Sequence, residues 1–223
     1  MAVRGTVAFD IIGTCFSLDQ ARARLAALGA PGHALELWFA QTLRDAMALS
    51  HAGGYRPLKD VLRAELPRTL RMLGVDATAH QLEAVVAGFA ELDPQPGLQE
   101  MIEALSGSGW RLLALTNGSE QSTRELLRRV GVVDSFAALL SCDAIGRFKP
   151  HPDVYERARR EAEGELWMVA AHAWDIAGAA MAGLRTLYVS GLEGRYLDVY
   201  PPPDATVGQL AEVADRLLRP ARR

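Results

Sequence analysis

Cysteine is scarce in this chain of 223 residues, which contains only Cys15 and Cys142. Two cysteines so far apart offer neither the ligand spacing of a zinc site nor the framework of a disulfide-stapled domain. The chain is long enough to bury a stabilising hydrophobic core without disulfide bonds or a structural metal. So little cysteine suits a reducing compartment, and we expect a cytoplasmic protein.

An excess of one charge is also missing. The 24 Lys and Arg nearly balance the 27 Asp and Glu, which leaves a net charge of −3. This balance gives no electrostatic reason to expect nucleic acid or an anionic membrane as a partner. No apolar run approaches the roughly 18 residues of a membrane-spanning helix, and the N-terminal segment meets a charge too early for a secretory signal. We expect no membrane association.

Strand-like and helix-like segments alternate along much of the chain. Short apolar runs typical of buried strands lie at residues 6–12, 111–117, 166–171 and 185–190. Amphipathic stretches typical of helices begin at Leu98, Gln121, Pro152 and Trp174. Such alternation favours right-handed βαβ units and a parallel sheet covered by helices. We predict an α/β fold with a Rossmann-like parallel-sheet core.

One long segment interrupts this alternation. Residues 17–92 contain almost nothing strand-like, and helical patterns lie at 19–29, 34–51, 57–73 and 78–91. A helical block of this size is too large for a crossover between two strands. We therefore predict two domains: a core made of residues 1–16 and 93–223, and an inserted helical cap of about four helices at residues 17–92.

Polar residues follow the predicted strands where chemistry is expected. In an open parallel sheet, ligands bind beyond the carboxyl ends of the strands. Four clusters stand at such places. They are Asp10 and Thr14, then Thr116 and Asn117, then Lys149 with Tyr155 six residues later, and finally His172, Trp174 and Asp175.

These clusters resemble, in order, the four motifs of the haloacid dehalogenase superfamily. They read FDIIGT, LTNGS, KP followed by Tyr155, and AHAWDIAGA in this chain. The resemblance is strongest to the L-2-haloacid dehalogenase branch, whose motifs read FDxYGTLF, LSNGS, YKPxPxVY and SSNAWD. It covers nearly the whole chain, and the helical insert is similar to the cap of that superfamily.

The resemblance implies roles for six catalytic residues. Asp10 would attack the halogen-bearing carbon and form an ester, which water would then hydrolyse. Thr14 and Thr116 would hold the carboxylates of Asp10 and of the substrate, and Asn117 would supply an amide. Lys149 would neutralise charge near Asp10, and Asp175 would orient Lys149 or the hydrolytic water. A lysine between two carboxylates keeps both ionised, which makes this arrangement coherent.

Ile12 argues against a phosphatase. In the phosphatases of the superfamily, the residue two places after the nucleophile is an Asp that protonates the leaving alcohol, a step worth about 10²–10⁴-fold in rate. A halide leaves without a proton, so isoleucine is tolerable in a dehalogenase.

Phosphatases also place an acidic pair where this chain has Ala171 before Asp175. Asp10 and Asp175 alone would make a weak magnesium site. The dehalogenase interpretation requires no cofactor.

The chain also departs from the dehalogenase pattern. The branch has an Arg on a cap helix that receives the halide, and Phe39 stands there in this chain; a halide leaving without a cation loses electrostatic help. Arg44, further along the same predicted helix, and His172, if protonated, are the alternative cations. The remaining substrate-contacting candidates implied by position are Ile12, Tyr155 and Trp174.

Three functions therefore stay open. The first is hydrolysis of a small (S)-2-halocarboxylate through an Asp10 ester. The second is magnesium-dependent phosphatase or phosphotransferase activity on an activated phosphate. Such a substrate has a good leaving group, which needs no general acid at the position of Ile12. The third is a protein that keeps the fold and binds a ligand without turnover. By resemblance alone, a homodimer is expected.

Overall fold

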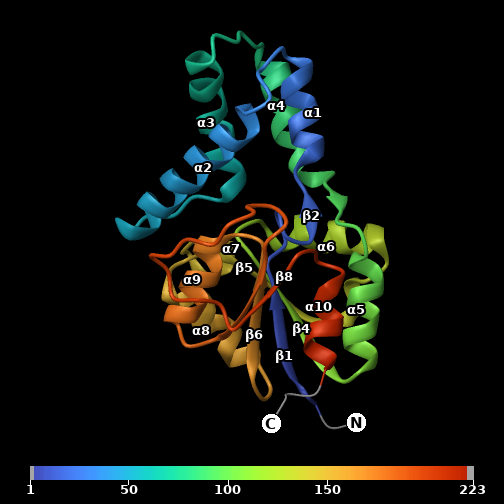
Figure 1. Ribbon diagram of the computed structural model, residues 1–223. Helices are drawn as coiled ribbons and strands as arrows, with labels where there is room; N and C mark the ends of the chain where they lie inside the picture. The colour runs from blue at the N-terminus through green and yellow to red at the C-terminus, as the bar shows by residue number, and fades with distance from the viewer. Residues whose placement is uncertain (1–2, 220–223) are drawn as a thin grey trace.

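The computed structural model describes residues 3–219 as a parallel sheet with helices on both faces and a helical cap above one edge (Figure 1). The outermost residues of the predicted core, 1–2 and 220–223, lie outside the described part. The six strands are β1 (Gly5–Phe9), β4 (Trp110–Thr116), β5 (Phe136–Ser141), β6 (Leu166–Ala170), β7 (Arg185–Val189) and β8 (Ala205–Val207). The predicted Rossmann-like parallel sheet is confirmed.

The sheet order places β1 at its centre. The spatial order is β5-β4-β1-β6-β7-β8, and every neighbouring pair is parallel. Numbered within the sheet, this is the 3-2-1-4-5-6 order of dinucleotide-binding folds, whose strand order reverses beside the first strand. The carboxyl ends of β1, β4 and β6 therefore meet at the switch point, where ligands bind in open α/β sheets.

Both faces of the sheet are buried. Val7 and Phe9 of β1 pack into one hydrophobic cluster and Ala8 into the other, as the alternation of side chains along a strand requires. Helices α5 and α10 lie on one side and α8 and α9 on the other (Figure 1). The core helices are α5 (Leu98–Gly107), α6 (Glu120–Val130), α7 (Cys142–Ile145), α8 (Pro152–Glu161), α9 (Ala173–Met181) and α10 (Glu212–Leu218).

The cap is formed by helices α1–α4, which stand over the carboxyl edge of the sheet (Figure 1). Their bounds are α1 (Asp19–Ala27), α2 (Ala34–His51), α3 (Leu58–Met72) and α4 (Ala79–Ala87), and a 3₁₀ turn follows at Gly88–Ala90. The two chain segments that join cap and core pair with each other as antiparallel strands β2 (Phe16–Ser17) and β3 (Asp93–Pro94). The exact domain boundaries stay a prediction.

The first strand is shorter than the sequence pattern suggests. The apolar run predicts a strand through Ile12, but β1 ends at Phe9. The amide of Asp10 still donates to the Val169 carbonyl at 3.0 Å, and then the chain turns at Gly13, whose φ is +86°. Ile11 and Ile12 therefore belong to the loop that holds Asp10, and not to the sheet.

No helix within residues 3–219 combines the length and the apolar character that crossing a membrane would need.

Candidate active site

Asp10 lies at the carboxyl end of β1 and is 4% exposed. Its two oxygens have different partners: Oδ1 accepts a hydrogen bond from Lys149 Nζ at 2.7 Å, and Oδ2 accepts one from Thr14 Oγ1 at 2.6 Å. Thr14 is itself fixed, because its Oγ1 accepts from the amide of Ala171 at 2.9 Å. The loop after β1 and the end of β6 thus position the carboxylate together.

Lys149 connects the two acidic residues of the site. Its fully buried Nζ donates to Asp10 Oδ1 and to Asp175 Oδ2, each at 2.7 Å. Burial alone would lower the pKa of Lys149, but the two carboxylates outweigh it and hold the pKa above its ordinary value. The ammonium therefore stays charged throughout the neutral range.

Asp175 lies in the first turn of α9 and is fully buried. Its Oδ1 accepts from the Tyr155 hydroxyl at 2.7 Å. Burial raises the pKa of Asp175, and the attraction of Lys149 opposes that rise. Tyr155 was predicted among the substrate-contacting residues, but it is fully buried and does not line either cavity beside the site. Its hydroxyl holds the Asp175 carboxylate in place through this hydrogen bond.

The turn after β4 supplies Asn117 to the site. Asn117 Oδ1 accepts from the amide of Lys149 at 3.0 Å and from Cys142 Sγ at 3.2 Å. Because these donors occupy Oδ1, its Nδ2 is the group left to face a ligand in the cavity that Asn117 lines. Thr116 is placed differently from the prediction: its buried Oγ1 accepts from the amide of Gly118 at 3.0 Å, and it does not line that cavity.

A small cavity of about 10 Å³ lies beside Asp10. This volume is about that of one water-sized group. Its walls are mainly apolar: Ile12 and Trp174 come from the core, and Phe39 and Leu43 come from α2 of the cap. Three predicted substrate-contacting residues, Ile12, Phe39 and Trp174, therefore line the same cavity as Asp10.

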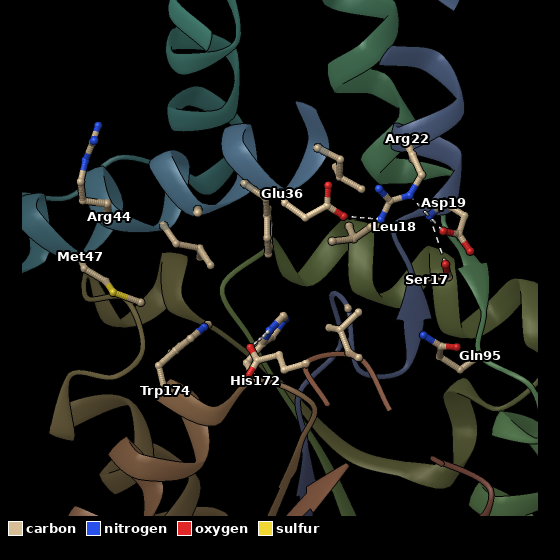
Figure 2. Close-up of a pocket in the computed structure, with 17 residues that line it drawn as sticks. Ser17, Leu18, Asp19, Arg22, Glu36, Arg44, Met47, Gln95, His172 and Trp174 are labelled. Carbon is tan, nitrogen blue, oxygen red and sulfur yellow. Dashed lines mark hydrogen bonds and ion pairs between the residues drawn. The ribbon is translucent and has the colours of Figure 1, made fainter. Parts of the chain in front are cut away.

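A second cavity, of about 650 Å³, lies between cap and core, with Arg44 and Met47 on its cap side and His172 and Trp174 on its core side (Figure 2). The two cavities share Phe39, Leu43, His172 and Trp174 as walls. Arg44 lines only the larger one, and its guanidinium is paired with Asp45 at 2.7 and 2.9 Å. The structure does not bring Arg44 to the small cavity, so it is not the missing cation there.

His172 reaches the small cavity and has an acidic partner that the sequence did not reveal. Its Nδ1 lies 3.3 Å from Glu193 Oε1, and its Nε2 lies 3.3 Å from the carbonyl of Ile12. Glu193 belongs to the irregular segment between β7 and β8. No local pattern marks this glutamate, because only the tertiary fold brings it to His172.

The site does not fit a magnesium ion. Lys149 Nζ lies between the carboxylates of Asp10 and Asp175, where a cation would have to bind both. Among residues 3–219, no three His, Cys, Asp or Glu side chains are grouped so that they could hold a metal. The two carboxylates proposed for the magnesium alternative are thus already ion-paired with Lys149.

Comparisons with known proteins agree with this geometry. The profile of the haloacid dehalogenase-like hydrolases matches residues 5–183. The chain is 27% identical over 215 residues to an (S)-2-haloacid dehalogenase of a Pseudomonas species, covering 94% of this chain and 92% of that protein. It is also 30% identical over 175 residues to a glyceraldehyde 3-phosphate phosphatase of Methanopyrus kandleri, covering 71% and 74%.

A solved structure resembles the whole chain. It is the L-2-haloacid dehalogenase of Xanthobacter autotrophicus with chloropropionic acid covalently bound. The TM-score is 0.85 at 25% identity, and the match covers 100% of both chains.

Proposed function

This chain belongs to the haloacid dehalogenase-like hydrolase family, and from that membership we propose that it hydrolyses the carbon–halogen bond of a small (S)-2-halocarboxylate through Asp10. The observation that carries the proposal is the buried Asp10–Lys149–Asp175 arrangement, which holds an ionised carboxylate beside an apolar cavity. Residue 12, two places after the nucleophile, is an isoleucine that offers no proton to a leaving group. A halide needs none.

The proposed reaction has two steps. In the first, an Asp10 oxygen attacks the halogen-bearing carbon, the carbon–halogen bond breaks, and the halide departs with the electron pair, which leaves an ester on Asp10. In the second, water attacks the carbonyl carbon of that ester and the bond from this carbon to the substrate oxygen breaks. One proton of the water goes to the departing 2-hydroxy acid, and the other is released to solvent as the Asp10 carboxylate re-forms. Lys149 and Thr14 hold the Asp10 carboxylate in place for the attack.

The similarity to a phosphatase supports a second candidate function, the magnesium-dependent hydrolysis of an activated phosphate. The Lys149 bridge between Asp10 and Asp175 disfavours it, because magnesium would have to displace the ammonium. A binding protein without turnover is disfavoured as well, because a buried ion-paired carboxylate beside a cavity is costly to retain without a use.

The direct test is halide release from L-2-chloropropionate and L-2-bromopropionate, with and without magnesium, for the native protein and for Asp10→Asn. We expect release that does not depend on magnesium and that the substitution reduces by at least about 10³-fold. Acetyl phosphate with magnesium is the matched assay for the second candidate. Turnover of acetyl phosphate without halide release would replace the proposal by phosphate chemistry.

Labelled water tests the covalent route separately. Over many turnovers in H₂¹⁸O, the ester mechanism places ¹⁸O in the Asp10 carboxylate, and mass spectrometry of the peptide that contains Asp10 detects it. Direct attack of water on the substrate would label only the hydroxy acid.

The cytoplasmic location and the homodimer expected from the sequence remain predictions. Sedimentation velocity checks whether the protein is a dimer.

A further inference from the structure

The small cavity beside Asp10 must receive the leaving anion if the proposed function holds, and the following inference rests on that function. Phe39, Leu43 and Trp174 make most of its wall apolar. An anion that forms in such a place is poorly stabilised unless a charge or a hydrogen-bond donor faces it. No lysine or arginine among residues 3–219 lines this cavity, and His172 is the basic side chain that does.

The position of His172 is fixed on several sides. The ring is 7% exposed and lies nearly parallel to Trp174, with centroids 5.5 Å apart and an interplanar angle of 16°. Phe39 of the cap lies against it at 6.1 Å. The backbone makes room for it as well, because a Cβ at Gly13 would lie 2.6 Å from His172 Nε2. The imidazole is therefore held in one place at the wall of the cavity.

Glu193 is held as a partner for the imidazole. Its Oε1 lies 3.3 Å from His172 Nδ1, while Oε2 accepts from the amide of Ala173 at 2.9 Å and from the Tyr188 hydroxyl at 3.4 Å. These two donors stabilise the ionised carboxylate. Burial would raise the pKa of Glu193, but the hydrogen bonds from His172 and from the Ala173 amide lower it overall.

The groups around the ring favour its charged form. Burial alone would lower the pKa of His172, but the bond to Glu193 and the negative charges of Asp10 and Asp175 raise it overall. The opposing cation, Lys149, is occupied between Asp10 and Asp175.

The cap adds no competing charge at the ring. Helix α2 presents Phe39 to His172, and its charged residues Glu36 and Arg44 are paired with Arg22 and Asp45. His172 and Asp10 therefore line the same small cavity, and the charges around the ring favour its protonated form.

We propose that His172, held in its charged form by Glu193, binds the halide as it leaves the substrate carbon. The Nε2–H group is the charged donor for this purpose, and Nδ2 of Asn117, which lines the same cavity, is a second, neutral donor. Its present acceptor, the carbonyl of Ile12, is 3.3 Å away, which is long for a hydrogen bond, and an anion is a stronger acceptor than a neutral carbonyl. No proton needs to move: the electron pair of the broken bond goes to the halide, and the imidazolium supplies charge and one hydrogen bond.

Leaving-group dependence tests this role in the enzyme. For His172→Gln, kcat/KM should fall by about 10²-fold with L-2-chloropropionate and by less with L-2-iodopropionate, because chloride is the poorer leaving group and needs more stabilisation. In Glu193→Gln, the loss of activity on the alkaline side should begin at lower pH, because the histidine loses its proton more easily. Equal losses for both halides, or an unshifted pH profile, would overturn the proposal.

A binding measurement separates this proposal from the proposed function, because it needs no turnover. The chain has five histidines, and NMR of ¹⁵N-labelled imidazoles follows each titration, with His172→Gln assigning the relevant signal. Sodium bromide at ten times its Kd should raise the titration midpoint of His172 by about one pH unit, because the anion binds the charged form. Sodium sulfate of equal ionic strength is the control for a general effect of salt on the titration.

The two experiments together distinguish the possible failures. If bromide leaves the midpoint of His172 unchanged while the enzyme releases halide, the role of His172 is wrong and the proposed function stands. If bromide raises the midpoint but no 2-haloacid is turned over, the anion site stands and the proposed function is wrong.

Discussion

Lys149 is one of only two lysines in the chain, beside Lys59, whereas the other basic side chains, histidine aside, are arginines. The geometry explains why a lysine stands at this position. A compact ammonium can donate to Asp10 and Asp175 at 2.7 Å each within a fully buried space. A planar guanidinium is larger and favours side-by-side bonds to a single carboxylate. Lysine is thus the cation that suits a position between two acids.

Lys149→Met should leave two buried carboxylates facing each other without a cation. One of them must then take up a proton, because burying two like charges together is unfavourable. We expect halide release at neutral pH to fall by at least about 10²-fold, and the residual rate to rise with pH as that proton is lost. Lys59→Met, at an exposed position on α3, is the control. A residual rate that does not change with pH would contradict this interpretation.

Phe39 separates the small cavity beside Asp10 from the cavity of about 650 Å³. Phe39→Ala should join the two spaces, so that acids with longer side chains fit. We expect the ratio of kcat/KM for 2-bromohexanoate to that for 2-bromopropionate to rise by at least about 10-fold, since 2-bromohexanoate has three more methylenes and one buried methylene contributes about 1–3 kcal/mol. Met47→Ala, which enlarges only the outer cavity, should leave the ratio nearly unchanged. Equal ratios for the two variants would show that Phe39 is not the barrier.

At the scale of elements, the cap contacts the chain segment that leads to Lys149. Tyr55, between α2 and α3, donates to Asp143 Oδ1 at 2.7 Å, and its ring stacks on Phe148 at 4.7 Å. Ser50, near the end of α2, accepts from the amide of Phe148 at 3.1 Å. Phe148 directly precedes Lys149, so these contacts connect the position of the cap to the position of Lys149.

Tyr55→Phe should weaken cap closure while it keeps the stacked ring. One partly exposed hydrogen bond contributes about 0.5–1.5 kcal/mol, so we expect KM to rise by about 2- to 10-fold with little change in kcat. Faster proteolysis between cap and core should accompany the rise. Tyr196→Phe removes a tyrosine hydrogen bond within the core, to the Pro201 carbonyl, and serves as the control. If both variants behave alike, the Tyr55 contact does not hold the cap.

Local patterns predict some elements well and others not at all. Residues 34–51 were expected to form a helix, and α2 spans Ala34–His51, because apolar residues recur there at helical spacing over many turns. Strand β5 was missed because its run continues directly into α7, and β8 because three residues are too few for a pattern. The paired strands β2 and β3 depend on a contact between segments more than 70 residues apart.

The candidate site likewise contains residues that could be predicted from the sequence and residues that could not. Asp10, Lys149 and Asp175 could be found from sequence because each stands in a recognisable motif: Asp10 directly follows β1, Lys149 precedes α8, and Asp175 lies in the first turn of α9. Glu193 could not, because its role depends on a contact with His172 across an irregular loop. Tyr155 was also found, but the sequence does not show that its side chain is buried and donates to Asp175, away from both cavities.

At the scale of the whole molecule, the His172–Glu193 pair links the active site to the stability of the fold. The pKa of His172 is raised above its ordinary 6.5, so its contribution is full below that pH and is lost as the pH rises through the folded value. The pKa of Glu193 is lowered from 4.5, so its contribution is present above that pH and is lost as the pH falls through the folded value. The pair should therefore stabilise the protein most between these two values.

Urea unfolding of the native protein and of His172→Asn measures this contribution. The difference in the free energy of unfolding between the two should be larger at a pH between 4.5 and 6.5 than in the alkaline range, where the native imidazole has lost its proton. His80→Asn, at an exposed position on α4, should show no such change with pH. A difference that is the same at both pH values would mean that His172 stabilises the fold only by packing, as a neutral ring.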